Sequence, residues 1–204
     1  MDNSSEVLWP TRAQCPGVLL SDPSLTPAAV LILLFHNNKG HHLVLTKRSI
    51  KVEHHKGEIC FPGGKQDPND STLLQTALRE THEEIGVRPE DVKLLGALTP
   101  TATTSGFAIS PFVGQIPYPY YLQVNKKEIS EVIEVPLSIF FDPTSLRTKA
   151  ICTSDKQTTI VSYIYGTHTI WGATARIITE LVGLLATDIG KETPWNALKP
   201  SIKI

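Results

Sequence analysis

Residues 63–87 read GGKQDPNDSTLLQTALRETHEEIGV, a glycine-rich segment that leads into apolar and acidic residues with helical spacing. We predict a helix over residues 71–85 because apolar residues recur there every three or four positions. Asp70 or Ser71 is placed to cap its start, and Gly86 is placed to end it. Pro62 and the two glycines that follow predict a tight loop between this helix and a short strand over residues 58–61.

The predicted helix has two different faces. At about 100° per residue, an apolar stripe forms that should pack on a sheet. It consists of Leu74, Leu78, Thr81 and Ile85. Glu80, Glu83 and Glu84 fall on another face, where like charges at spacings of three and four residues destabilise a helix unless a cation compensates them. Carboxylate oxygens are hard ligands that suit Mg²⁺ or Mn²⁺, so we expect a metal site here.

The charge around this helix is unevenly distributed. From residue 39 to 65 there are six Lys or Arg against two Glu, a balance of +4, whereas residues 66–91 hold seven acids against two Arg, a balance of −5. Two solvated surfaces of opposite sign would explain the pattern. The alternative is one site, in which the basic segment holds an anionic substrate and the acidic segment holds metal cations.

The same stretch resembles the Nudix box, in which Gly, five residues, Glu and seven residues precede Arg-Glu-U-x-Glu-Glu-x-Gly-U, where U is aliphatic. The matching residues are Gly64, Arg79, Glu80, Glu83, Glu84, Gly86 and Val87. There are three departures: Asp70 stands at the first Glu position, eight residues separate it from Arg79, and Thr81 takes the first aliphatic position.

The preceding stretch, LTKRSIKVEHHKGEICFPGG over residues 45–64, resembles the signature of the coenzyme A pyrophosphatase branch of the Nudix hydrolases. In that branch the box also tends to read as residues 63–70 do, which accounts for the departures. Later segments resemble further blocks of the branch: residues 105–107, 111–114, 128–137 and 170–175.

The resemblance implies roles for individual residues. Glu80 and Glu84 are expected to bind the metal, Glu83 to bind a further ion or its waters, and the Gly64 carbonyl to complete the site. Arg79 is expected to orient the carboxylates through charge-assisted hydrogen bonds.

The basic segment and a downstream glutamate are expected to complete the site. Residues expected to contact the phosphates or the nucleotide are Arg48, Ser49, His55 and Lys56. For the general base, Glu128 is the first candidate and Glu131 the second, and Glu80 itself is an alternative. The alternative interpretation is that Glu128 and Glu131 are ordinary surface residues beside Lys126 and Lys127.

The paired histidines and Trp171 are interpreted as structural residues. The adjacent pairs His41-His42 and His54-His55 lack a cysteine or a third spaced histidine, so we do not expect zinc there. Trp171 is expected to anchor the last helix in the core.

The 204 residues and 41% hydrophobic content predict one folded domain. Strands are expected over residues 28–36, 42–47, 58–61, 92–98, 107–115, 120–124, 147–152 and 158–165, with a second helix over 172–185. The expected class is α+β, an α/β/α sandwich with a mixed β-sheet between helices. The expected organisation is an extended arm over 1–27, the Nudix hydrolase domain over 28–189 and a tail over 190–204.

Composition limits the partners. The longest apolar run has eight residues, Ala28–Phe35, too short to cross a bilayer, and the net charge of −1 lacks the basic excess of a nucleic-acid-binding surface. The N-terminus lacks the pattern of a signal peptide, so a cytoplasmic protein is expected. Three separated cysteines are expected to be reduced and structural. The sequence leaves open whether the protein forms a homodimer.

Three functions are compatible with these features. The first is a Mg²⁺- or Mn²⁺-dependent pyrophosphatase that cleaves coenzyme A or its derivatives to 3′,5′-ADP and (acyl-)4′-phosphopantetheine. The second is the same chemistry on another nucleoside diphosphate derivative, such as ADP-ribose or NADH. The third is a non-catalytic nucleotide-binding module, which the presence of all three box glutamates disfavours.

Overall fold

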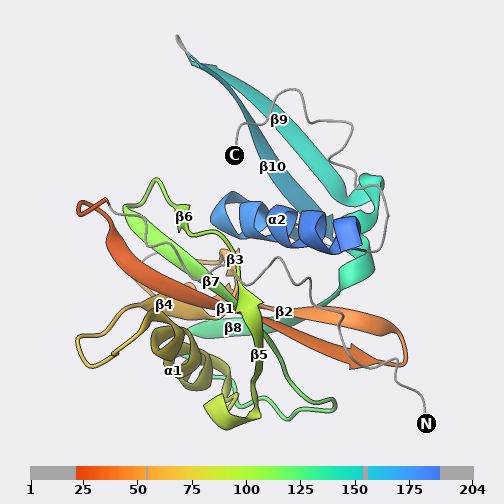
Figure 1. Cartoon of the computed structure of the whole chain (residues 1–204). Helices are drawn as coiled ribbons and strands as arrows, with labels where there is room; N and C mark the ends of the chain where they lie inside the picture. Colours follow the sequence, from red (N-terminus) through yellow and green to blue (C-terminus); the bar gives the residue numbers. More distant parts are fainter. Residues whose placement is uncertain (1–21, 54, 154–155, 189–204) are drawn as a thin grey trace.

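The protein folds into layers in which two helices flank a mixed β-sheet (Figure 1). The structure is a computed structural model that describes residues 22–53, 55–153 and 156–188. The strands are β1 Thr26–Asn37, β2 Gly40–Arg48, β3 Ile59–Cys60, β4 Gly63–Lys65, β5 Lys93–Ala97, β6 Thr101–Ala102, β7 Phe107–Gln115, β8 Ile129–Pro136, β9 Leu146–Thr153, β10 Lys156–Tyr165 and β11 His168–Ile170. The helices are α1 Leu73–Ile85 and α2 Gly172–Asp188, with 3₁₀ turns η2 Pro89–Asp91, η3 Leu137–Phe141 and η4 Pro143–Ser145.

Strand β1 is the centre of the larger sheet. It pairs antiparallel with β2 and β4 and parallel with β7, and β8 joins the far edge of β2. Its run of apolar residues is buried on both faces, as expected of a central strand covered on both sides. Leu31, Leu33 and Phe35 pack in the core on the α1 side, whereas Ile32 and Leu34 pack in the core on the α2 side.

The hydrophobic core on the α2 side lies between the larger sheet and α2. It includes Ile177, Ile178 and Leu181 of α2 together with Tyr163 of β10 and Phe140 of η3. The three-stranded sheet β11-β10-β9 borders this core, and the β9–β10 hairpin extends away from the larger sheet in Figure 1. The sandwich with a mixed sheet between helices, predicted from the sequence, is therefore confirmed.

Helix α1 begins two residues later than predicted. Thr72 is the N-cap, and its side chain accepts a hydrogen bond from the Gln75 amide, because the carboxylate of Asp70 is engaged elsewhere. Gly86 ends the helix in the left-handed conformation with φ 75°, as predicted.

The buried face of α1 differs from the predicted apolar stripe. Thr81 and Ile85 are buried as expected, but Leu74 and Leu78 are only half-buried. The remaining buried positions are Thr76, Ala77 and Glu84. The expectation that Glu84 lies away from the packed face was wrong, because its side chain enters the interface between the helix and the sheet.

Other predictions have mixed outcomes. The strand expected over residues 120–124 is absent from this described segment, and Trp171, expected in the core, has 49% of its surface exposed. Cys60 is a free thiol, whereas Cys15 and the side chain of Cys152 lie outside the described residues, as does most of the predicted arm and all of the tail.

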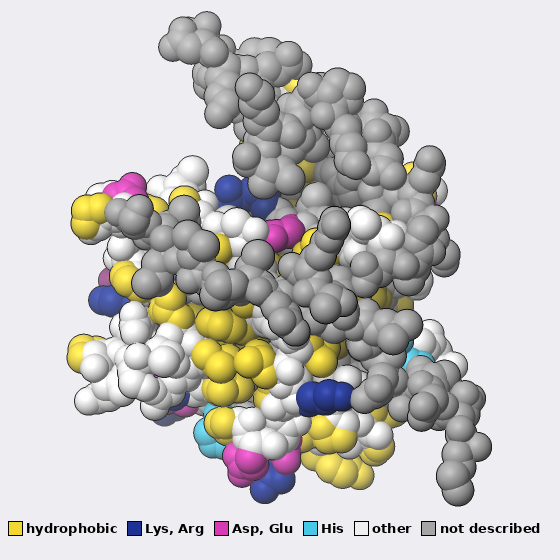
Figure 2. Space-filling view, in the orientation of Figure 1, with side chains coloured by type: hydrophobic (Ala, Val, Ile, Leu, Met, Phe, Trp, Pro, Cys, Tyr) yellow, Lys and Arg dark blue, Asp and Glu magenta, His cyan; other side chains and the backbone are white. Residues whose placement is uncertain are grey.

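The described part of the surface shows no extended basic face in the view of Figure 2, where Lys and Arg side chains lie in separate patches among hydrophobic and polar ones. None of the helices over the described ranges is long and apolar enough to span a membrane.

Candidate active site

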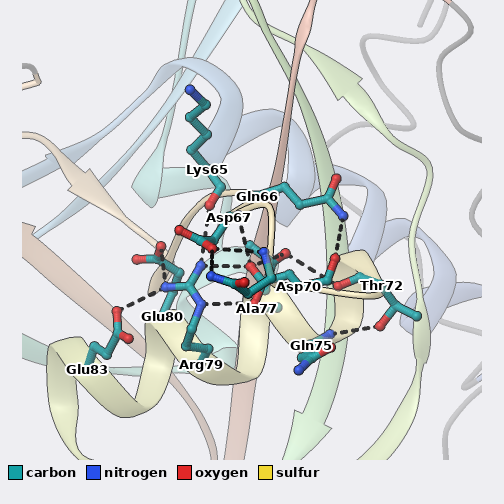
Figure 3. Close-up of polar contacts among 12 residues, drawn as sticks. Lys65, Gln66, Asp67, Asp70, Thr72, Gln75, Ala77, Arg79, Glu80 and Glu83 are labelled. Atoms are coloured by element: carbon teal, nitrogen blue, oxygen red, sulfur yellow. Dashed lines mark hydrogen bonds and ion pairs between the residues drawn. The ribbon is translucent and has the colours of Figure 1, made fainter.

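The guanidinium of Arg79 is the hub of the carboxylate cluster on α1 (Figure 3). Its Nε and Nη2 donate to the two carboxylate oxygens of Asp70 at 3.0 and 2.8 Å, and its Nη1 donates to Glu80 at 2.9 Å and Glu83 at 3.0 Å. Such bidentate, charge-assisted pairs fix geometry as well as charge. Arg79 therefore orients Glu80 and Glu83 from the side of the 65–70 loop.

Asp70 is the residue whose role the sequence did not reveal. Its side chain is buried, and it also accepts hydrogen bonds from the Asp67 amide at 3.0 Å and the Thr76 hydroxyl at 2.9 Å. The hydrogen bond from Arg79 holds the pKa of Asp70 well below its usual range. Asp70 thus anchors Arg79, and the one-residue change in spacing within the box does not prevent it from reaching that guanidinium.

Glu84 is the most deeply buried carboxylate of the cluster, with 1% of its surface exposed. The Gly63 amide donates to it at 3.3 Å, and Arg48 Nη1 lies 3.5 Å from its Oε1. Burial raises the pKa of Glu84 to about 8 against the opposing effect of Arg48, and burial also raises the pKa of Glu80. Two long contacts thus leave a buried carboxylate incompletely compensated.

Two glycines bring the sheet close to these carboxylates. Strand β4 pairs with β1 and contacts α1, so that Gly64 lies directly against Glu80. A Cβ at Gly64 would lie 2.5 Å from the Glu80 Cδ, and one at Gly63 would lie 2.3 Å from the Ala29 carbonyl oxygen. The space at Gly64 that a methyl group would fill is occupied by the Glu80 carboxylate.

Residues from three separate segments meet around Glu84. Asn125 donates from its backbone amide to the Glu84 carbonyl at 2.9 Å and from its side chain to Glu128 at 2.8 Å. The Ser49 amide donates to the Glu128 carbonyl at 2.7 Å. Glu128 is close enough for its charge to contribute to the raised pKa of Glu80 and of Glu84.

The predicted substrate-binding residues divide into two groups. Arg48 and Ser49 adjoin the cluster through Glu84 and Glu128, and Arg48 Nε is buried without a hydrogen-bond partner among the described residues. His55 and Lys56 lie exposed on the loop before β3, where His55 contacts Glu58 at 3.1 Å. Within the described ranges, neither His55 nor Lys56 contacts a carboxylate of α1.

The donor set fits a hard divalent cation. Its side-chain donors are carboxylate oxygens, which Mg²⁺ and Mn²⁺ prefer. Glu84 is also buried, and the charge of Arg48 does not fully offset the cost of burying an ionised carboxylate. In the described ranges no three His, Cys, Asp or Glu side chains already converge on one point, because Arg79 engages Glu80 and Glu83. A pocket of about 290 Å³ opens beside Glu80 and is lined by Lys65, Gln66, Asp67, Pro68 and Arg79.

The chain combines a layered fold with a cluster of carboxylates on one helix, and comparison with known proteins identifies its family. A model of the NUDIX domain matches residues 25–148, so the chain belongs to the Nudix family. Nudix hydrolases act on small nucleotide-derived substrates and generally use divalent metal ions.

Relatives and one solved structure agree with this assignment. The chain is 37% identical over 154 residues to the uncharacterized Nudix hydrolase NudL of Photorhabdus laumondii, covering 76% of this chain and 82% of that protein. It is 36% identical over 166 residues to NudL of Pectobacterium atrosepticum, covering 78% and 85%. A MutT/nudix family protein from Enterococcus faecalis shares the fold, with a TM-score of 0.53, 18% identity and coverage of 89% and 70%.

Proposed function

We propose that this Nudix hydrolase cleaves the diphosphate of coenzyme A or its derivatives and releases 3′,5′-ADP and (acyl-)4′-phosphopantetheine. The observation that carries the proposal is the contact between Arg48 and Glu84. Residues 45–64 resemble the coenzyme A branch, and Arg48 of this segment lies 3.5 Å from the buried carboxylate of the box. A basic segment that reaches the carboxylates is what a diphosphate substrate requires.

Glu80, Glu83, Glu84 and the carbonyl of Gly64 are the groups proposed to hold the divalent ions. When bound, a divalent cation supplies Lewis-acid polarisation of the phosphoryl oxygens and offsets developing negative charge. Arg79, itself held by Asp70, holds Glu80 and Glu83 through hydrogen bonds, and Glu80 lines the pocket.

The remaining residues are proposed to act on the substrate and on water. Arg48 presents a buried Nε donor that a phosphate oxygen can satisfy, and Ser49, His55 and Lys56 add donors along the same segment. Glu128 is proposed to take a proton from the attacking water. The water oxygen bonds to one phosphorus as the bridging P–O bond breaks, and the leaving phosphate takes the bond's electrons.

Product analysis tests the proposal. We would incubate tag-free protein with coenzyme A and Mg²⁺, and with ADP-ribose and NADH in parallel, and identify products by mass spectrometry. We expect 3′,5′-ADP and 4′-phosphopantetheine to form faster than any product of the other two substrates. Faster cleavage of ADP-ribose or NADH would show that this compound, and not coenzyme A, is the preferred substrate. No cleavage of any of the three would contradict the proposal.

A matched pair of variants separates the enzyme from a contaminating hydrolase. Glu84→Gln removes a proposed metal ligand, whereas Glu90→Gln makes the same chemical change at an exposed position in η2. If Glu84→Gln abolishes the cleavage and Glu90→Gln does not, this protein and not a contaminant catalyses the reaction.

A further inference from the structure

The end of the β1–β2 hairpin brings together two histidines that are five positions apart in the sequence. His36 and His41 are directly opposite each other across the strand pair, and their ring centroids are 4.7 Å apart with a tilt of 59° between the rings. His42, the sequence neighbour of His41, lies on the other face of the sheet and stacks on Phe35. The structurally relevant pair is therefore His36 and His41, not the adjacent residues His41 and His42.

The separation of the two rings matches that of imidazoles that share one metal ion. A metal–imidazole bond is about 2.0–2.1 Å long, so two rings that bind one ion at roughly 90–110° have centroids on the order of 4.5–5 Å apart. The observed 4.7 Å lies within that range. Both side chains are partly exposed, so the pair lies at the surface of the hairpin.

A second observation concerns the Nδ1 atom of His41. This atom is buried and has no hydrogen-bond partner within the described part of the chain. A buried polar atom without a partner is unfavourable, and a metal ion bound to that nitrogen would give it one. Burial, with smaller contributions from His36 and His42, lowers the pKa of His41.

We propose that His36 and His41 form a binding site for a transition-metal ion such as Ni²⁺, Cu²⁺ or Zn²⁺. Imidazole nitrogens favour these ions over Mg²⁺, which the carboxylate cluster is suited to hold. No third His, Cys, Asp or Glu of the described ranges joins the pair, so water completes the coordination and the ion exchanges readily.

The histidine pair is separate from the proposed catalytic site. Ala29 of β1 is paired with Gly64 of the carboxylate site, and His36 lies seven residues further along the same strand. At about 3.3 Å per residue, this places the histidines roughly 23 Å away. Metal binding at the hairpin should therefore leave hydrolysis supported by Mg²⁺ unchanged.

Titration of the full-length, tag-free protein with Ni²⁺ tests the proposal. Calorimetry should detect one site that His36→Gln and His41→Gln each weaken by about tenfold or more. His168→Gln is the matched control, because His168 contacts a carboxylate, Glu131, at 3.3 Å but no second histidine among the residues that the structure describes. This variant should retain the wild-type affinity.

Nuclear magnetic resonance locates the ion and checks the fold of each variant. Paramagnetic Ni²⁺ should broaden the amide signals of residues 36–41 in the wild type and leave them sharp in both hairpin variants. Unchanged Ni²⁺ affinity in either folded variant would overturn the proposal, as would broadening confined to other residues. Absence of binding below about 1 mM would do the same.

Discussion

At the scale of single residues, the two adjacent glycines of β4 should respond differently to replacement by alanine. A methyl group at Gly64 would meet the flexible end of Glu80, whereas one at Gly63, with φ 148°, would meet the backbone of Ala29 and Val30. We therefore expect Gly64→Ala to displace the Glu80 carboxylate and reduce kcat strongly while the protein stays folded. Gly63→Ala should lower the free energy of unfolding by at least about 2 kcal/mol.

Chemical denaturation and steady-state kinetics on both variants check this contrast. Full activity in Gly64→Ala would show that the position of the Glu80 carboxylate does not control turnover. Wild-type stability in Gly63→Ala would show that the strand can move away from β1.

The buried carboxylate of Glu84 leads to a second prediction. Glu84→Gln should reduce kcat by about 10²-fold or more, because the neutral amide is a poor ligand for a hard cation. The thermal midpoint should be unchanged or higher, because burial disfavours the ionised carboxylate. A large fall in the midpoint would instead make Glu84 chiefly a structural residue.

The spacing of Glu80, Glu83 and Glu84 placed three carboxylates on one predicted helix, and all three lie on α1. It could not show that Glu84 is buried, because burial depends on how α1 is rotated against the sheet. It also could not show that Asp70 holds Arg79, because that contact depends on the path of the 65–70 loop.

At the scale of the structural element, Asp70 ties the 65–70 loop to α1. Asp70→Asn should destabilise the protein by about 1–3 kcal/mol, because it removes the charge from a buried bidentate pair. It should also reduce activity, because Arg79 loses the partner that orients it. Asp67→Asn is the matched control for stability, because the Asp67 side chain is exposed and accepts hydrogen bonds from Asn69 of its own turn.

The effect of Asp70→Asn should depend on pH in a defined direction. The pKa of Asp70 is lowered in the folded protein, so the ionised pair stabilises the fold at neutral pH. That stabilisation declines once the pH falls below the unfolded-state pKa of about 3.9 and is lost as the pH falls through the folded-state pKa. The difference in stability between wild type and variant should therefore narrow in acid, and a constant difference would contradict the assignment.

The end of α1 depends on close contact with the segment that follows residue 115. Gly86 has φ 75°, and a Cβ there would lie 2.6 Å from the Cβ of Gln123. Gly166 has a similar φ of 59° but nothing within 4 Å. Gly86→Ala should therefore cost clearly more than the roughly 1–2 kcal/mol expected of Gly166→Ala from backbone conformation alone. Equal losses in thermal unfolding would exclude the contact as the cause.

The error at residues 120–124 has a physical explanation in the same region. The Gln123 and Asn125 amides donate to the Ile85 and Glu84 carbonyls and so cap the end of α1 instead of joining a sheet. Tyr120 donates from its hydroxyl to Asp91. Local β-propensity did not reveal these long-range partners. In β8, exposed Glu134 lies between buried Ile133 and Val135, an alternation typical of a strand, although no strand was predicted there.

At the scale of the whole molecule, metal binding and folding should be separable. Both hydrophobic cores are built from apolar side chains of the sheet and helices, so a chelator should abolish hydrolysis without unfolding the protein. Adding Mg²⁺ at about 100 times its Kd should stabilise the fold by about 2.7 kcal/mol. Differential scanning fluorimetry should show this shift in the wild type but not in Glu84→Gln, and an equal shift in both would place the ion elsewhere.

The order of the strands could not be derived from the pattern of single elements. The sequence predicted strands over residues 28–36, 42–47 and 107–115, which correspond to β1, β2 and β7, because the signals for single strands are local. The parallel pairing of β1 with β7 joins residues about eighty positions apart, so no local pattern in the sequence indicates it.

That parallel pairing has a consequence for synthesis on the ribosome. Thr26 to Leu34 of β1 match Phe107 to Gln115 of β7 residue by residue, so one edge of the most apolar strand remains without its partner until residue 115 has left the exit tunnel. An uncovered apolar edge invites association between nascent chains. Expression trials should therefore find truncations that end before residue 107 to be aggregation-prone.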